Sequence, residues 1–320
     1  MAGAIFPSLD PDAYEPHLLH GADRVWPETN CYVDLWIEVL AAMGAEPRAL
    51  LGFTAAMDFE GDQFTFFKPP LEDLEVLYGI RVGELAIYDR VEQHITVQLA
   101  RGRLSIVEVD SFYLPDTKGV SYHNAHGKTT VAPNRIDIAG RRMEYFHNGG
   151  YFVLEGEDFD GIFLGSGDPA RPFLPYTEFA KLPETAVGED ALRARAADLL
   201  HRRIGQRPAA NPVREFQARI AEQAESLVGR PFDAFHQYAF NTLRQLGANF
   251  ELMADHLIWL DGDNVSQQAV AAASAIAQTA KATQFQLARS VMKKSVDRLV
   301  GAINPAVDAY DLLFDELGRR

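Results

Sequence analysis

The sequence predicts an α+β protein in which an antiparallel sheet is followed by a helical bundle. Short β-type runs separated by turn residues fill about residues 48–165, and long helical patterns fill the last third of the chain. A segment rich in Pro and Gly, residues 165–183, lies between these regions. Because 320 residues suffice for two cores, we expect one domain at 1–183 and a second at 184–320.

The first domain is expected to begin with a helix and continue as a sheet. Apolar spacing predicts a helix over residues 31–45, with Gly44 as its C-terminal stop, and a shorter helix over 71–78. Asn148-Gly149-Gly150 separates the last two predicted strands and is typical of a hairpin. The predicted strands cover residues 64–67, 95–99, 104–109, 129–132, 143–146 and 151–154.

The second domain is expected to be helical throughout. Asn211-Pro212 and Asn264-Val265-Ser266 are typical of a capping residue followed by a helix. The predicted helices cover residues 189–205, 212–228, 232–260, 266–300 and 305–317.

Composition limits the partners and the compartment. The net charge of −15 disfavours duplex nucleic acid and anionic membrane surfaces as partners, because the long-range field repels both. No secretory or membrane-spanning pattern is found, so we expect a cytoplasmic protein. The histidines lack metal-ligand spacing, and no Gly-rich loop carries the lysine of a phosphate site, so neither a metal nor a bound nucleotide is expected.

Cys31, the single cysteine, is the first candidate functional residue. It lies where a polar loop becomes the first predicted helix, and the positive end of a helix dipole favours the nucleophilic thiolate. One cysteine cannot form an internal disulfide. The alternative interpretation is a buried thiol that acts as a small hydrophobic residue.

A thiol nucleophile needs a base, and the base needs a group that orients it. His126 opens one predicted strand and Asn148 closes the next, so adjacent antiparallel strands would bring their side chains together. His123 and His147 stay open as alternative bases. His147 and Asn148 are neighbours on a strand, so only one of them can face the thiol.

A further segment, Val107-Glu108-Val109-Asp110-Ser111-Phe112-Tyr113-Leu114-Pro115, precedes these histidines. With the order Cys31, His126, Asn148, residues 25–165 resemble papain-like enzymes, in the branch of bacteriocin-leader peptidases and the acyl-carrier-protein:aminoglycoside acyltransferase of butirosin biosynthesis. Nearly the whole chain is also similar to a bacterial family often encoded beside amino-acid:carrier-protein ligases and small carrier proteins. That similarity rests on the segments Tyr-Leu-Pro-Asp-Thr, His-x-Lys-Thr-Thr and Tyr-Phe-His-Asn-x-Gly-Tyr.

The resemblance implies that Cys31 is the nucleophile, His126 its base and Asn148 the orienting group. Papain has a glutamine ahead of its cysteine that lines the oxyanion hole, and residues 25–30 contain none. Asn30 or the backbone N–H of Cys31 would then donate to the oxyanion, a contribution of roughly 3 kcal/mol per donor. This difference disfavours peptide hydrolysis more than transfer of an activated thioester.

Three further groups have two interpretations each. Asp110 either anchors the site by hydrogen bonding or ends a strand at a turn. Lys128 either stabilises an anionic substrate group or thiolate on the side of the strand that His126 faces, or is solvated. Arg195, Arg202 and Arg203 belong to a basic cluster that either docks an acidic carrier protein or forms a solvated helix face.

These observations together predict a cytoplasmic papain-like transferase. Cys31 would accept an acyl or aminoacyl group from the phosphopantetheine thioester of a carrier protein and pass it to an amine or hydroxyl acceptor. The phosphopantetheine arm belongs to the partner, and no cofactor of the chain's own is expected. The alternatives are a cysteine peptidase or amidase, and a non-catalytic protein that binds the carrier.

Overall fold

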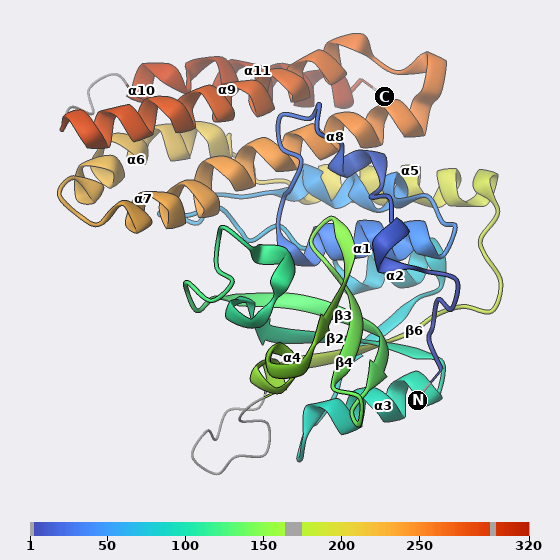
Figure 1. Ribbon diagram of the computed structural model, residues 1–320. Helices are drawn as coiled ribbons and strands as arrows, with labels where there is room; N and C mark the ends of the chain where they lie inside the picture. The colour runs from blue at the N-terminus through green and yellow to red at the C-terminus, as the bar shows by residue number, and fades with distance from the viewer. Residues whose placement is uncertain (1–2, 164–174, 295–298, 320) are drawn as a thin grey trace. The chain divides into compact units, whose positions relative to one another are not determined.

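The computed structural model describes residues 3–163, 175–294 and 299–319 and divides the chain into two compact units (Figure 1). The first unit comprises Met1–Gly21, Asn30–Pro47 and Pro70–Gly188. The second comprises Ala22–Thr29, Arg48–Pro69 and Glu189–Arg320. Two N-terminal segments thus belong to the second unit together with the chain from Glu189 onward.

Packing explains why those two segments belong to the second unit. The indole N–H of Trp26 donates to the carbonyl of Ala277 at 3.1 Å. The ring of Phe64 lies 5.1 Å from that of Phe216. Both aromatic side chains are buried, and their partners lie in the C-terminal helices.

The α+β prediction is confirmed by the first unit. Its sheet has six strands in the described residues, in the order β1-β6-β2-β3-β4-β5, and every neighbouring pair is antiparallel. The strands are β1 (Arg81–Glu84), β2 (Arg103–Asp110), β3 (Lys128–Asp137), β4 (Arg142–His147), β5 (Gly150–Glu155) and β6 (Thr177–Lys181).

Helices pack on this sheet from different segments of the chain. Helix α1 (Cys31–Ala42) packs on β3 and β4, and α2 (Leu71–Tyr78) lies beside β1. Helices α3 (Val91–Ala100) and α4 (Gly156–Phe163) share a hydrophobic core with Val107, Val131 and Tyr145 of the sheet.

Two predicted strands are wrong. Residues 95–99 belong to α3, because Val91, Ile95 and Leu99 are buried at helical spacing, whereas Val97 is 52% exposed. Residues 64–67 form no strand. The isolated bridge between Phe59 and Phe64 is the nearest β-type pairing.

The segment predicted to be a linker, residues 165–183, instead contains β6, which pairs with both β1 and β2. Residues 164–174 lie outside the described residues. Strand β6 is five residues long and pairs only with distant segments, so its local pattern carried little signal.

The prediction of a helical C-terminal region is confirmed. Within the described residues, no helix combines the length and apolar character needed to cross a membrane. The predicted helix 266–300 includes residues 295–298, which are not described. The helices are α5 (Glu189–Gln206), α6 (Pro212–Leu227), α7 (Phe232–Ala239), a π-helical segment (Phe240–Arg244), α8 (Gln245–Asp261), α9 (Gln267–Lys293), α10 (Leu299–Ala302) and α11 (Asn304–Leu317).

Helix α1 carries two fully buried carboxylates, Asp34 and Glu38, that share one histidine as their cationic partner. The imidazole Nδ1 of His20 hydrogen-bonds Glu38, and its Nε2 lies 3.3 Å from Asp34 Oδ1. The hydroxyl of Tyr14 donates to Glu38 at 2.5 Å, and the backbone N–H of His17 donates to the same carboxylate at 3.0 Å. The N-terminal segment is thus held against α1 by buried polar contacts.

The same contacts set the charge of His20. Burial alone would lower the pKa of His20, but hydrogen bonds and charges from Asp34 and Glu38 outweigh it and raise this pKa from 6.5 to about 9. The folded state therefore binds the His20 proton more tightly than the unfolded chain. Its contribution to stability is complete below pH 6.5 and is lost as the pH rises through about 9.

We predict that His20→Ala lowers the free energy of unfolding by about 3–5 kcal/mol at pH 7, because two buried carboxylates lose their cation. Urea unfolding followed by circular dichroism measures this loss. The matched control His201→Ala, at an exposed position of α5, should change stability by less than about 0.5 kcal/mol. The wild type should also lose stability between pH 6.5 and 9, and an identical pH profile in His20→Ala would contradict the assignment.

Candidate active site

Cys31 is the first residue of α1, as the sequence predicts. The side-chain oxygen of Asn30 accepts the backbone N–H groups of Tyr32 and Val33, both at 3.1 Å. This cap explains why the helix begins at residue 31. The oxygen of Asn30 is therefore engaged by the helix, and the two predicted oxyanion donors, the side-chain amide N–H of Asn30 and the backbone N–H of Cys31, lie together at this terminus.

The thiol of Cys31 lies against β3 and is partly exposed. Its Sγ is 3.7 Å from Thr130 Oγ1, a weak hydrogen bond in which the thiol donates. No hydrogen bond joins Cys31 to His126 in the part of the chain that the structure describes. The site thus contains a half-buried thiol with a hydroxyl partner, and the predicted contact between thiol and imidazole is not formed.

His126 is paired with a carboxylate that the sequence left with two interpretations. Its Nδ1 lies 2.6 Å from Asp110 Oδ2, and its ring stacks on Phe112 with centroids 4.4 Å apart. The other oxygen of Asp110 accepts the backbone N–H groups of Phe112 and Gly127 at 3.1 Å each. Asp110 therefore anchors this part of the site, and His126 keeps its Nε2 toward solvent with the side chain 70% exposed.

The pKa of Asp110 follows from these contacts. Burial acts to raise it, but the hydrogen bonds from His126, Phe112 and Gly127 outweigh that effect and lower the pKa below the usual 3.8. The carboxylate is thus ionised over the neutral range and accepts the Nδ1–H of His126, which leaves the Nε2 of His126 outside the hydrogen bond to Asp110.

Asn148 does not orient His126. It lies in the turn between β4 and β5 with a left-handed backbone, φ 46°. Its neighbour Gly149 packs on His20 so closely that a Cβ there would lie 2.6 Å from the imidazole Cγ. In the described residues no hydrogen bond joins Asn148 to His126, and Asp110 holds the place that the resemblance gave to Asn148.

The alternative base His147 lies on the other face of the sheet. Its Nε2 is 2.7 Å from Thr129 Oγ1 and its Nδ1 is 2.5 Å from Asp116 Oδ2, whose other oxygen accepts the hydroxyl of Tyr145. Because Thr129 and Thr130 are adjacent on β3, their side chains point to opposite faces. His147 is therefore separated from Cys31 by the sheet.

The second alternative base, His123, is bound to α4. Its Nε2 lies 2.9 Å from Asp158 Oδ1, and the hydroxyl of Tyr122 donates to the other oxygen of Asp158 at 2.7 Å. Helix α4 shares its core with the face of the sheet that carries Val131, not with the face of Thr130. Of the three histidines, His126 is thus the one whose carboxylate partner, Asp110, lies opposite Lys128 on the sheet face that carries Thr130.

Lys128 is the predicted cation closest to Thr130 along β3. Its Nζ donates to Glu108 Oε1 at 2.7 Å, and Glu108 lies directly opposite Thr130 in the β2–β3 register. Residues 128 and 130 share one face of the strand, as do directly opposed residues of neighbouring strands. The ion pair therefore lies next to the hydroxyl that Cys31 contacts.

The sequence analysis did not identify Glu178, which lies on the same face of the sheet as Thr130. This buried carboxylate of β6 accepts the hydroxyls of Tyr32 at 2.7 Å and Tyr176 at 2.8 Å. Tyr32 directly follows the candidate nucleophile, so Glu178 ties the first turn of α1 to the sheet. Only the pairing of β6 with β2, which no local pattern indicates, places it there.

The three residues of the predicted arginine cluster differ in how exposed they are. Arg195 and Arg202 are exposed on α5, seven positions apart and hence on a similar side of the helix. Arg203 is buried and donates to Gln206 at 2.7 Å, so it is not part of a docking surface. In the described residues, no group of three or more His, Cys, Asp or Glu side chains is arranged to hold a metal ion.

The fold and this site define an α+β protein with a partly exposed thiol at a helix N-terminus. Residues 15–182 match the DUF1839 N-terminal domain, and residues 189–319 match the DUF1839 C-terminal domain. The chain therefore belongs to the DUF1839 family. No curated protein matches it.

The two adjacent threonines give a matched pair of variants. We predict that Thr129→Val lowers the free energy of unfolding by about 1–3 kcal/mol, because it leaves the buried Nε2 of His147 unpaired. Thr130→Val, which removes only the weak contact to the thiol, should cost less than about 1 kcal/mol.

The rate of Cys31 alkylation by iodoacetamide distinguishes the two faces of the sheet. Thr130→Val should change this rate and Thr129→Val should leave it as in the wild type. Equal effects of the two variants on the rate would contradict the placement of Cys31 beside Thr130.

Proposed function

We propose that this protein is a cytoplasmic, papain-like acyltransferase in which Cys31 accepts an acyl or aminoacyl group from a carrier-protein thioester. An amine or hydroxyl acceptor then takes the group from Cys31. The observation that carries the proposal is the placement of the thiol at the first residue of α1, against a hydroxyl rather than in an apolar core. The dipole of α1 favours negative charge at this place.

The proposed reaction has two steps. The Cys31 thiolate attacks the carbonyl carbon of the carrier thioester, a bond to Cys31 forms, and the bond to the pantetheine sulfur breaks with its electron pair on that sulfur. The acceptor nitrogen or oxygen next attacks the acyl-Cys31 carbonyl and gives up a proton. Cys31 leaves as a thiolate, which restores the starting state.

The absence of an imidazole hydrogen-bonded to the thiol favours this chemistry over peptide hydrolysis. In the first step a thiolate replaces a thiolate, so no proton has to be delivered to the leaving group. An amide substrate expels an amine, which has to be protonated as it leaves. The described contacts of Cys31 supply no acid for that purpose, so the peptidase alternative has less support.

We assign His126 as the base that deprotonates the acceptor, and not as the base that deprotonates the Cys31 thiol. It lies four positions before Thr130, outside β3, and in the described residues it forms no hydrogen bond to Cys31. Its Nδ1 is engaged by Asp110, which leaves Nε2 to take the acceptor's proton. Lys128 lies between His126 and Thr130 in the sequence, and its cationic side chain is suited to bind an anionic part of the substrate.

We predict that incubation with an aminoacylated carrier protein adds the mass of the aminoacyl group to this chain. Intact mass spectrometry measures the adduct, which should be absent in Cys31→Ala and labile to hydroxylamine. His126→Ala should still form the adduct but release it to the acceptor at least about tenfold more slowly.

Each other outcome points to a specific alternative. An adduct that persists in Cys31→Ala contradicts the nucleophile assignment. Turnover of peptide or amide substrates without any carrier supports the hydrolase. Tight binding of the carrier with no adduct supports the non-catalytic alternative, for which the lack of a thiol–imidazole contact is the favouring observation.

Arg195 and Arg202 are the proposed docking residues for the acidic carrier protein. We predict that the double variant Arg195→Glu/Arg202→Glu raises the KM for the carrier by about tenfold at low ionic strength, and that salt reduces the difference. The KM for a small pantetheine thioester should not change. Arg230→Glu, at an exposed position outside the cluster, is the matched control, and an equal effect there would contradict a specific docking surface.

A further inference from the structure

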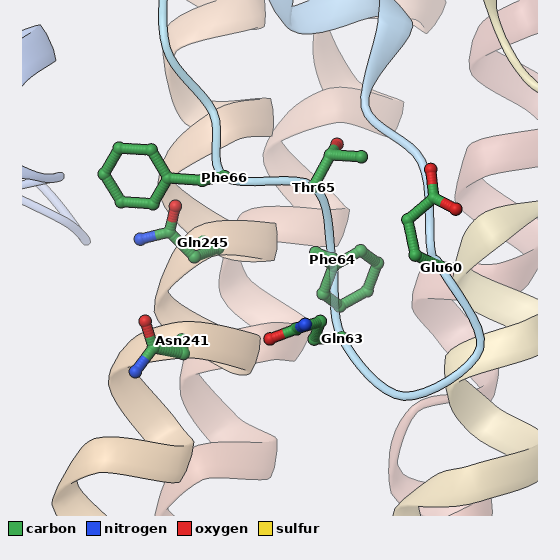
Figure 2. A pocket seen from close by; sticks show the side chains of 7 residues that line it. All are labelled: Glu60, Gln63, Phe64, Thr65, Phe66, Asn241 and Gln245. Carbon is green, nitrogen blue, oxygen red and sulfur yellow. The ribbon is translucent and has the colours of Figure 1, made fainter.

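The second unit contains a pocket that the proposed reaction does not use. Its volume is about 290 Å³, which is roughly ten times the share of one water molecule in the liquid. Figure 2 shows a loop on one side and a helix on the other. The pocket is lined by Glu60, Gln63, Phe64, Thr65, Phe66, Asn241 and Gln245.

The loop wall is held in place by a short hairpin. Phe59 and Phe64 form a β-bridge, and the backbone N–H of Glu60 donates to the carbonyl of Gln63 at 2.8 Å. The ring of Phe64 is buried against Phe216 of α6. This wall is therefore anchored to the helices, whereas the side chains of Gln63 and Phe66 are exposed at its rim.

The helix wall is an interruption in otherwise α-helical backbone. The π-helical segment Phe240–Arg244 joins α7 to α8, so Asn241 and Gln245 face the pocket from a widened turn. Such π-helical turns are rare and are frequently found at functional sites.

Gln245 provides the observation that points to a ligand. Its side chain is buried, with 1% of the residue exposed, and its Nε2 donates to the carbonyl of Phe240 at 3.5 Å. In the described residues its Oε1 has no hydrogen-bond partner. Exchanging the two amide atoms would bring two carbonyl oxygens together, so the oxygen is the unpaired atom. A buried acceptor without a donor destabilises the fold.

The lining residues restrict the chemistry of what binds. An unpaired carbonyl oxygen requires a donor, and Phe66, 52% exposed, offers an aromatic face for a flat group. Among the described residues that line the pocket, none is cationic, and Glu60 contributes a carboxylate. Phosphates and carboxylates are thus disfavoured.

We propose that this pocket binds a neutral, planar secondary amide whose flat face lies on Phe66 and whose N–H donates to Gln245 Oε1. The exposed amides of Gln63 and Asn241 are placed to bind the ligand's carbonyl (Figure 2). We infer that rotation of the exposed Gln63 and Phe66 side chains gives the ligand access to Gln245. This site lies within the second unit and does not depend on the role of Cys31.

A matched pair of small molecules tests the donor requirement on the full chain. N-methylbenzamide has a flat ring and one N–H, and N,N-dimethylbenzamide lacks the N–H. Titration followed by NMR of the side-chain amides of Gln and Asn should give an affinity for N-methylbenzamide about tenfold higher. The signals of Gln245 and Asn241 should shift most.

Substitution of Gln245 adds a second test. Gln245→Met has nearly the same volume and no oxygen, so it should abolish the preference between the two amides. Gln278→Met, at an exposed position of α9, should retain the preference.

Three results would overturn the proposal. Equal affinity for the two benzamides, or saturable binding of neither, means that the pocket does not select an N–H donor. Binding of benzoate as tight as that of N-methylbenzamide contradicts the charge argument. A preference that survives in Gln245→Met means that Oε1 is not the acceptor of the ligand's N–H.

Discussion

The buried cation of His20 between Asp34 and Glu38 fixes the position of α1, and the candidate active site depends on it. Two carboxylates on adjacent turns of one helix cannot be buried without a positive partner. His20 supplies that charge from the segment preceding α1, and Gly149 fits against its ring from the β4–β5 turn. The helix, the N-terminal segment and the hairpin are thereby joined at one point.

The alternation of side chains along β3 divides the polar groups of the first unit into two sets. On one face Thr129, His147 and Asp116 form a buried chain of hydrogen bonds, which holds the loop before β3 against β4. On the other face Thr130 contacts the thiol, and the Glu108–Lys128 ion pair lies next to it. Neighbouring residues in the sequence thus serve different purposes, and a shift of register by one residue would exchange them.

The sequence predicted those features whose signals are local. The start of α1 followed from the apolar spacing after a polar loop, and the strands around Asn148-Gly149-Gly150 followed from hairpin chemistry. Strand β6 was missed because its partners lie far away in the chain. The contacts of the candidate active site were likewise hard to predict, because they join residues that lie far apart in the sequence. Cys31 was placed correctly at its helix terminus, but the partner of His126 is decided by the β2–β3 register, which sets Asp110, the last residue of β2, opposite Lys128 and within hydrogen-bond distance of the imidazole.

The connectivity of the chain has a consequence for how its two units fold. Helix α1 lies in sequence between residues 22–29 and residues 48–69, and both of these segments belong to the second unit. Trp26 and Phe64 are buried there, so a chain cut after residue 183 would expose apolar side chains that have no other core to enter. The helix that carries the candidate nucleophile is therefore tethered at both ends to the other unit. If the C-terminal helices unfold, residues 22–29 and residues 48–69 both lose the core into which they pack. The stability of the second unit therefore determines whether the segments that flank α1 stay ordered.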